Sequence, residues 1–261
     1  NVKLEAANYS EDGVFAGCLN LKSVELNGTK QLTNYTFADC TELNNVNFGN
    51  GLLSIKEGAF YNCTSLKTLS LPDSLRTLDA KAFEGCASLE TVCLPANVDA
   101  VTAPVFYRCN QLEKIDVTAE NTNYKSIDGV LYSADGSTLV EFPAAKAAGY
   151  RVPTGTTEIG ARAFYGNPYL QIVSVSKGVQ RIKEDAFAGC KELQYIALPS
   201  TLTEIEYGAL DESEYLEAVF FGGTEQEWYR LGYYFDHNVD VYLIKEPSFA
   251  KQLTDVSVVN G

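Results

Sequence analysis

The chain has 261 residues, of which 46% are hydrophobic and 21% are charged, a composition typical of a globular protein. Its formal net charge of -14 repels phosphate groups, which disfavours nucleic acid and anionic membrane surfaces as partners. No apolar run approaches the roughly 20 residues that a membrane-spanning helix needs, so we expect no direct membrane insertion. No signal peptide is recognisable and the chain contains no Met, so we expect a mature or trimmed fragment.

A phrase of regularly spaced apolar residues recurs along most of the chain. Its third copy, FYNCTSLKTLSLP, begins at Phe60 and places Leu66, Leu69 and Leu71 in the order L-x-x-L-x-L. Most copies begin 23 residues after the previous one, and a fixed period of about 20–29 residues with this order predicts a leucine-rich solenoid. The opening residues are Phe15, Phe37, Phe60, Phe83, Phe106, Phe164, Phe187 and a degenerate Leu210.

The repeat predicts how the chain folds. We expect an α/β-type but strand-rich solenoid, a right-handed superhelix of about eight repeats of 23 residues with a parallel, concave sheet of eight strands. The small residue before most opening Phe side chains favours one short helical or 3₁₀ turn there. Because each repeat needs its neighbours to bury its apolar face, we predict a single leucine-rich repeat domain over residues 1–261.

The regular step breaks once in the middle of the chain. Phe106 and Phe164 are 58 residues apart, which is one period plus 35 residues. Two Asp-Gly pairs, at 128–129 and 135–136, separate short apolar alternations in this stretch and predict a β-meander. The predicted order is an N-terminal cap (1–14), repeats (15–118), the inserted β-meander (119–150), repeats (151–222) and a C-terminal cap (223–261).

The predicted C-terminal cap carries its own signals. The stretch from Thr224 to Glu227 has the form of a capping box and should open a short helix that includes Trp228. Residues 239–244 are predicted to form a strand, and the final dozen residues are expected to be loosely held.

Seven cysteines are many for a chain of this length, and six lie three positions after an opening residue. We predict that these six form a ladder of small buried side chains inside the coil, with disulfides between adjacent repeats as an alternative. No C-x-x-C pair occurs, so zinc is not expected. Cys93 falls on an outward strand position and is predicted to be an exposed thiol. The ladder positions are Cys18, Cys40, Cys63, Cys86, Cys109 and Cys190.

The sequence offers little for catalysis. His237 is the only histidine, so a Ser-His-Asp or Cys-His site would depend on this one residue. Acidic pairs such as Asp211-Glu212 are typical of solvated turns, and the Asp-Gly pairs lack the ligand series of a calcium loop. We therefore predict no catalytic residue, no metal site and no cofactor.

Two surfaces are candidates for ligand binding. Strand alternation predicts that Ile172, Tyr195 and Phe220 point outward from the last strands, where the earlier strands present small or polar side chains. Aromatic anchors of this kind are frequent in binding sites, although the C-terminal cap or the meander could instead cover them. The meander is the second candidate, since insertions in solenoids often modify the binding face. Its candidate residues are Tyr124, Tyr132 and Phe142.

The phrase AF-x-x-C-x-x-L-x-x-L-x-LP resembles the BspA-like, Treponema-type leucine-rich repeat of bacterial cell-surface proteins. The inserted YKSIDGVLYS-ADG-STLVEFP looks like a hairpin excursion of that family, and FFGGTEQEW resembles its terminal unit. The resemblance covers roughly residues 15–230. It implies export to an extracellular or cell-surface location and adhesive binding, but it identifies no particular partner.

Three functions follow from these observations. The first is a non-enzymatic binding module that docks a protein, from the host or another cell surface, or a glycan on its sheet face. The second is a structural spacer that displays another domain and presents a featureless face. A hydrolase is a remote third alternative, because the single histidine leaves little for a catalytic site.

Overall fold

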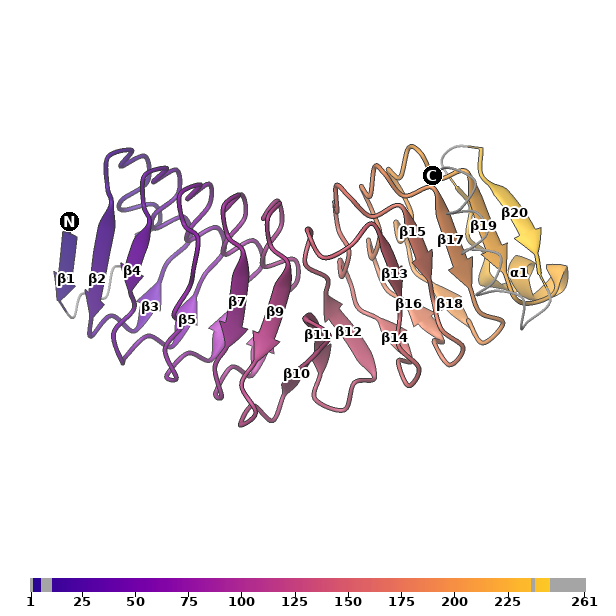
Figure 1. The fold of residues 1–261 in the computed structure, drawn as a ribbon, viewed down its shortest axis with the longest axis horizontal. Helices are drawn as coiled ribbons and strands as arrows, with labels where there is room; N and C mark the ends of the chain where they lie inside the picture. The colour runs from indigo at the N-terminus through magenta and orange to yellow at the C-terminus, as the bar shows by residue number, and fades with distance from the viewer. Residues whose placement is uncertain (1, 6–10, 236–237, 245–261) are drawn as a thin grey trace. The chain divides into compact units, whose positions relative to one another are not determined.

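A computed structural model describes residues 2–5, 11–235 and 238–244. They form a strand-rich β-solenoid of about 10 turns with parallel sheets and almost no helix (Figure 1). The chain divides into two compact units: unit 1 comprises Asn1–Gly136 with Val140–Lys146, and unit 2 comprises Ser137–Leu139 with Ala147–Gly261. The division falls inside the predicted meander, and the organisation of the whole chain as one domain stays a prediction.

Unit 1 contains two series of parallel strands, one from each half of the repeat. The shorter strands pair in one sheet, and their buried second residues recur every 23 positions, as in Leu32, Ile55 and Leu78. The first series is β1 (Val2–Glu5), β2 (Ser23–Asn27), β4 (Asn45–Asn47), β7 (Thr91–Leu94) and β9 (Lys114–Val117). The second series is β3 (Gln31–Leu32), β5 (Ser54–Ile55), β6 (Thr77–Leu78) and β8 (Ala100–Val101).

The predicted continuous eight-stranded sheet is interrupted in unit 1. Strands β1, β2 and β4 form one sheet, and β7 and β9 form another. In the repeat between them, Thr68 makes a single bridge to Thr91 of β7. Among the described residues, no strand pairs with the second edge of β4, so the backbone ladder stops there.

Unit 2 repeats the arrangement with a longer sheet. Strands β13 (Gly149–Arg151), β15 (Ile172–Ser174), β17 (Tyr195–Leu198), β19 (Ala218–Phe221) and β20 (Asp240–Leu243) form a continuous parallel series (Figure 1). The second series is β12 (Thr138–Glu141), of which only Thr138 and Leu139 belong to unit 2, followed by β14 (Glu158–Ile159), β16 (Arg181–Ile182) and β18 (Glu204–Ile205).

The opening phenylalanines stack on one another inside each unit. Phe60 lies between Phe37 and Phe83, with ring centroids 5.5 and 5.1 Å apart, and Phe164 lies 4.6 Å from Phe187. These rings are almost completely removed from solvent. Burying one such ring contributes about 1.5–3 kcal/mol, so the ladder is a main source of stability.

The turn around each opening residue is not helical, so the prediction of a short helical or 3₁₀ turn is wrong. Positive φ angles occur two residues before and two residues after the ring, as at Gly58 (φ 60) and Asn62 (φ 55) around Phe60. A left-handed residue ends any right-handed helical run. The backbone N–H groups freed in this way point to the next repeat, and Phe60 donates to the carbonyl oxygen of Ala82 at 2.8 Å.

The cysteine ladder is confirmed in five of its six positions. The thiol of Cys63 donates to the carbonyl oxygen of Phe37 at 3.2 Å, and Cys190 does the same to Phe164 at 3.0 Å. All seven cysteines are free, so the disulfide alternative does not apply. Cys18, at the first repeat, is exposed and departs from the prediction. Cys93 is an exposed thiol, as its outward position predicts.

The insertion begins with the predicted hairpin. Strands β10 (Tyr124–Ile127) and β11 (Val130–Ser133) are antiparallel. The turn residues Asp128 and Gly129 have φ angles of 50° and 75°, and two positive values are what a type I′ turn requires. Tyr132 and Phe142 are buried, at 0% and 5% exposure, so their side chains belong to the core.

Each series of inter-repeat hydrogen bonds needs an acceptor at its last turn. In unit 1, the carboxylate of buried Glu141 accepts from the backbone N–H of Phe106 at 2.8 Å and from that of Val105 at 3.1 Å. In unit 2, the hydroxyl oxygen of Tyr233 accepts from the backbone N–H of Leu210 at 2.9 Å. Side chains thus replace the carbonyl that another repeat would supply.

The end of unit 2 contains α1 (Glu225–Leu231), the only α-helix among the described residues. Thr224 and Glu227 form the predicted capping box, and Trp228 packs against Phe221 with centroids 5.4 Å apart. The predicted strand after the helix is β20. His237 and the final dozen residues lie outside the part of the chain that the structure describes.

Candidate functional site

The outer face of the unit 2 sheet brings together the residues that strand alternation predicts. Ile172 on β15 pairs in register with Tyr195 on β17, and Phe220 on β19 pairs with Ala197 on one side. On its other side Phe220 pairs with Tyr242 of β20. Ile172, Tyr195 and Phe220 are all half-buried, so each keeps part of its side chain in contact with solvent.

Three rings on this face are close enough to touch, and we name Tyr195, Phe220 and Tyr242 the aromatic row. Phe220 lies with its centroid 6.3 Å from that of Tyr195 and 5.5 Å from that of Tyr242. Tyr242 was not among the predicted site residues. The sequence could have indicated this position, because Tyr242 follows Phe220 by 22 residues and lies in the predicted last strand.

The C-terminal cap could have covered these residues, but in the structure its strand lies beside them. Strand β20 pairs beside β19 and extends the sheet by one strand. Tyr242 stacks on Phe220 but is itself 48% exposed. The cap therefore adds a third ring to the face and leaves that ring accessible.

Carboxylates border the aromatic row. The hydroxyl of Tyr195 donates to Glu217 at 2.6 Å, and the hydroxyl of Tyr242 donates to Asp240 at 3.1 Å. These hydrogen bonds raise the pKa of both tyrosines, so both phenols stay protonated at neutral pH. The exposed Arg151 of β13 is a cation at the opposite end of the same sheet. The face thus combines apolar rings with a mainly acidic border.

The meander residues do not form a second aromatic surface. Tyr132 and Phe142 are buried, so neither ring is accessible to a ligand at the surface. Tyr124 is half-buried, and its hydroxyl accepts from the backbone N–H of Val101 at 3.0 Å. Burial raises the pKa of Tyr124, which is consistent with a structural side chain.

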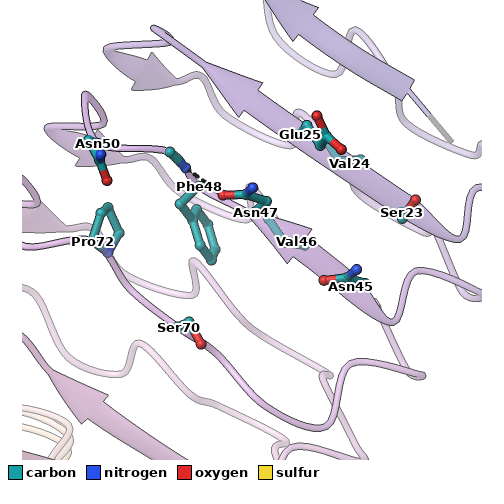
Figure 2. Close-up of a pocket in the computed structure, with 11 residues that line it drawn as sticks. Ser23, Val24, Glu25, Asn45, Val46, Asn47, Phe48, Asn50, Ser70 and Pro72 are labelled. Atoms are coloured by element: carbon teal, nitrogen blue, oxygen red, sulfur yellow. Dashed lines mark hydrogen bonds between the residues drawn. The ribbon is translucent and has the colours of Figure 1, made fainter.

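A polar hollow of about 470 Å³ lies on unit 1 at the interrupted edge of β4 (Figure 2). Its strand residues include Asn45 and Asn47, and Gly49 and Pro72 belong to its border. Gly49 has a φ of 62°, whereas Pro holds φ near -65°, so the two successive turns differ in shape. The backbone ladder of unit 1 stops at this border.

The chemistry of the hollow differs from that of the aromatic row. The side-chain oxygen of Asn47 accepts from the backbone N–H of Gly49 at 3.0 Å, as the dashed line in Figure 2 marks. Amide and hydroxyl groups supply most of its polar lining, together with the exposed carboxylate of Glu25. It offers hydrogen bonds but no exposed aromatic anchor.

Catalytic sites often depend on a metal ion or a reactive thiolate. Within the part of the chain that the structure describes, no group of three or more His, Cys, Asp or Glu side chains is placed to hold a metal ion. Partial desolvation and the nearby Asp116 raise the pKa of the exposed Cys93, which lowers its thiolate fraction. Among the described residues, no helix has the length and the apolar character needed to cross a bilayer.

The sequence matches the family described as "BspA type Leucine rich repeat region" in 6 copies, over residues 9–128 and 150–251. The chain belongs to the BspA-type leucine-rich repeat family. The two matched stretches flank residues 129–149 of this BspA-type chain, within its predicted insertion. No curated protein matches the BspA-type chain in a sequence comparison.

Solved structures agree with the family. A leucine-rich repeat protein from Eubacterium ventriosum is similar with a TM-score of 0.73 and 25% identity, over 80% of this BspA-type chain and 56% of that chain. The BspA-type chain therefore spans little more than half the length of that protein. The pneumococcal vaccine antigen PcpA is similar with a TM-score of 0.53 and 17% identity, over 85% and 78% of the two chains. The second similarity shows the fold alone.

Proposed function

We propose that this BspA-type protein is a non-enzymatic binding module that works outside the cell or at its surface. Its partner is a host extracellular protein or a protein of another cell surface, held on the aromatic row of unit 2. The observation that carries the proposal is the contact of three partly exposed rings, Tyr195, Phe220 and Tyr242, on one continuous sheet face. Large rings supply contact area at low entropic cost and dominate many protein interfaces.

Charge supports a protein partner with basic groups. Glu217 and Asp240 border the row, and the whole chain carries a net charge of -14. A partner with an apolar centre and a Lys- or Arg-rich rim would complement this face and would be steered toward it. Ala197 and Ala218 have short, buried side chains, so the rings protrude further than they do from the central strands.

A pull-down with the purified chain tests the proposal. Extracts of extracellular matrix and mucosa are passed over immobilised wild type and over a Tyr195→Ala/Phe220→Ala variant whose folding is verified by circular dichroism. A Thr68→Ala/Ser70→Ala variant, which changes exposed positions of the unit 1 face, is the matched control. We expect a partner that wild type and the control retain and that the aromatic variant loses.

Other outcomes would redirect the proposal. A partner that all three proteins retain equally would contradict a site at the aromatic row. Absence of any partner over several extracts would favour a structural spacer. High salt should weaken a genuine complex, because the acidic border contributes to its attraction.

A further inference from the structure

A pocket of about 400 Å³ lies at the end of unit 2, where the chain returns after α1 toward the last repeat. Three of its walls are tyrosines, Tyr207, Tyr233 and Tyr234. The rest of its lining is Ile205, Gly208, Asp211 and Gly232. The pocket shares no residue with the aromatic row.

One wall of this pocket is fixed by the end of the hydrogen-bond ladder. The hydroxyl oxygen of Tyr233 accepts from the backbone N–H of Leu210 at 2.9 Å. The same hydroxyl donates its proton to the carboxylate of Asp211 at 2.7 Å. These two bonds hold the ring of Tyr233 and the carboxylate of Asp211 in place before any ligand arrives, and such preorganisation favours binding.

The other two rings are almost entirely in water. Tyr207 is 85% exposed and Tyr234 is 87% exposed, so neither contributes appreciably to the core. They differ in this from buried Tyr132, whose ring is packed inside the fold. Two exposed rings beside a pocket can be covered by a ligand at little cost to folding.

The electrostatics of the lining determine whether the pocket favours a positively or a negatively charged ligand. Tyrosine faces carry the negative end of the ring quadrupole, and Asp211 adds a carboxylate. Among the described residues that line the pocket, none is Lys, Arg or His. An anion would be repelled, whereas a cation would meet three rings and one carboxylate.

We propose that Tyr207, Tyr233, Tyr234 and Asp211 form an aromatic cage for an organic ammonium group. Such cages bind methylated or quaternary ammonium groups better than compact, strongly hydrated cations, because the alkylated ion is easier to desolvate. The pocket volume, about 400 Å³, suits a small head group. The ammonium group could belong to a free small molecule or to a methylated lysine side chain of a peptide.

Titration with tetramethylammonium, followed by chemical shifts of the tyrosine rings, tests the cage. Its neutral isostere neopentane is poorly soluble, so tert-butanol serves as the uncharged probe. We expect tetramethylammonium to bind with a Kd in the millimolar range and tert-butanol to bind at least about fivefold more weakly. A trimethyllysine peptide and its unmethylated form then distinguish a peptide side chain from a free cation as the source.

Three variants make the result specific. Tyr207→Ala/Tyr234→Ala should raise the Kd at least about fivefold, and Asp211→Asn should raise it about threefold or more while keeping an oxygen for Tyr233. Tyr215→Ala, which removes another exposed ring outside the lining, is the matched control and should bind like wild type. Because Tyr207, Tyr234 and Tyr215 are exposed, all these tyrosine variants should fold.

Several outcomes would overturn the proposal. Binding of tert-butanol as strong as that of tetramethylammonium would show an apolar pocket with no preference for charge. Unchanged binding in the Tyr207→Ala/Tyr234→Ala variant would place the cation elsewhere. No shift at about 100 mM tetramethylammonium, far above the expected Kd, would exclude the cage. These results are independent of whether the aromatic row binds a protein.

Discussion

The two units of this chain share a ladder of stacked Phe rings and have different outer faces. Buried Cys thiols follow one another through the repeats of unit 1, whereas Cys190 is the one cysteine of unit 2 and Ser213 takes the next ladder position. On the outside, unit 1 presents Asn and Ser around a polar hollow, whereas unit 2 presents a row of three rings. The difference teaches that stacking constrains only the side chains that face the coil. The outer positions are free to vary, and a binding site can develop in one unit alone.

The ends of the two ladders differ in the same way. Unit 1 closes its last turn with a carboxylate, Glu141, and unit 2 closes its last turn with a hydroxyl, Tyr233. Both groups meet a backbone N–H that lacks the next repeat. Only the carboxylate can change its charge near neutral pH, so the two closures should respond differently to pH.

The largest expected effect is a loss of stability, and it tests whether the Phe ladders of the two units stabilise the fold equally. Phe60→Ala in unit 1 and Phe187→Ala in unit 2 each remove a fully buried ring from the ladder. Each should lower the free energy of unfolding by about 3–5 kcal/mol, measured by urea denaturation. A loss below about 1 kcal/mol in one variant only would show that the two ladders do not carry similar weight.

The next effect concerns the closure of unit 1. Burial raises the pKa of Glu141 from 4.5 to about 7, although the N–H groups of Phe106 and Val105 oppose the shift. The folded chain therefore holds this proton at a pH where the unfolded chain has released it. The resulting stabilisation is present below pH 4.5 and is lost as pH rises to about 7, a change of about 3 kcal/mol.

Unfolding by urea at several pH values measures this dependence. Glu141→Gln cannot ionise and should remove the part of the slope that wild type shows between pH 4.5 and 7. Glu120→Gln, at an exposed position of the insertion, is the control and should keep the slope of wild type. Identical slopes in Glu141→Gln and wild type would contradict a shifted carboxyl group.

A smaller effect is expected at the closure of unit 2. Tyr233→Phe keeps the ring but removes the hydroxyl that accepts from Leu210 and donates to Asp211. An N–H left without a partner costs about 1–3 kcal/mol when it is buried. Hydrogen exchange of the Leu210 amide should accelerate, together with a modest loss of stability in urea. Protection equal to that of wild type would mean that another acceptor replaces the hydroxyl.

The smallest effect distinguishes packing from hydrogen bonding in the cysteine ladder. Ser213 occupies the ladder position of the degenerate last repeat and donates to the carbonyl of Phe187 at 3.1 Å, as cysteines do elsewhere. Cys63→Ser should therefore cost less than Cys63→Ala, with the two differing by about 0.5–1 kcal/mol. Thermal unfolding of both variants measures the order. The reverse order would indicate that the thiol acts only through its volume.

Much of this architecture could be predicted from residue spacing. The step of 23 residues places Phe37, Phe60 and Phe83 in one ladder, because only that period stacks equivalent turns. The Asp128-Gly129 pair predicts a hairpin, since both residues tolerate positive φ. The positions of Tyr195 and Phe220 on the outer face follow from the alternation of strand side chains.

Other features could not be predicted because they depend on contacts between distant residues. Nothing local marks Tyr132 and Phe142 as core residues or distinguishes them from the exposed rings of Tyr207 and Tyr234. The acceptor role of Glu141 joins positions 35 residues apart across an irregular insertion, where the period no longer applies. The expected helical turn is not formed because Asn62 and its equivalents adopt left-handed φ angles. Asn tolerates such angles, but its presence alone does not predict them.

The sequence by itself determined the period, the interior ladders and the outward direction of the strand side chains. Those properties follow from a repeat that must bury the same face at every turn. Only the tertiary structure decided where the sheet is interrupted, which side chains close the ladders and which tyrosines gather around a pocket. These outcomes arise where the repeat stops, because there the partner of each group is a residue that no period relates to it.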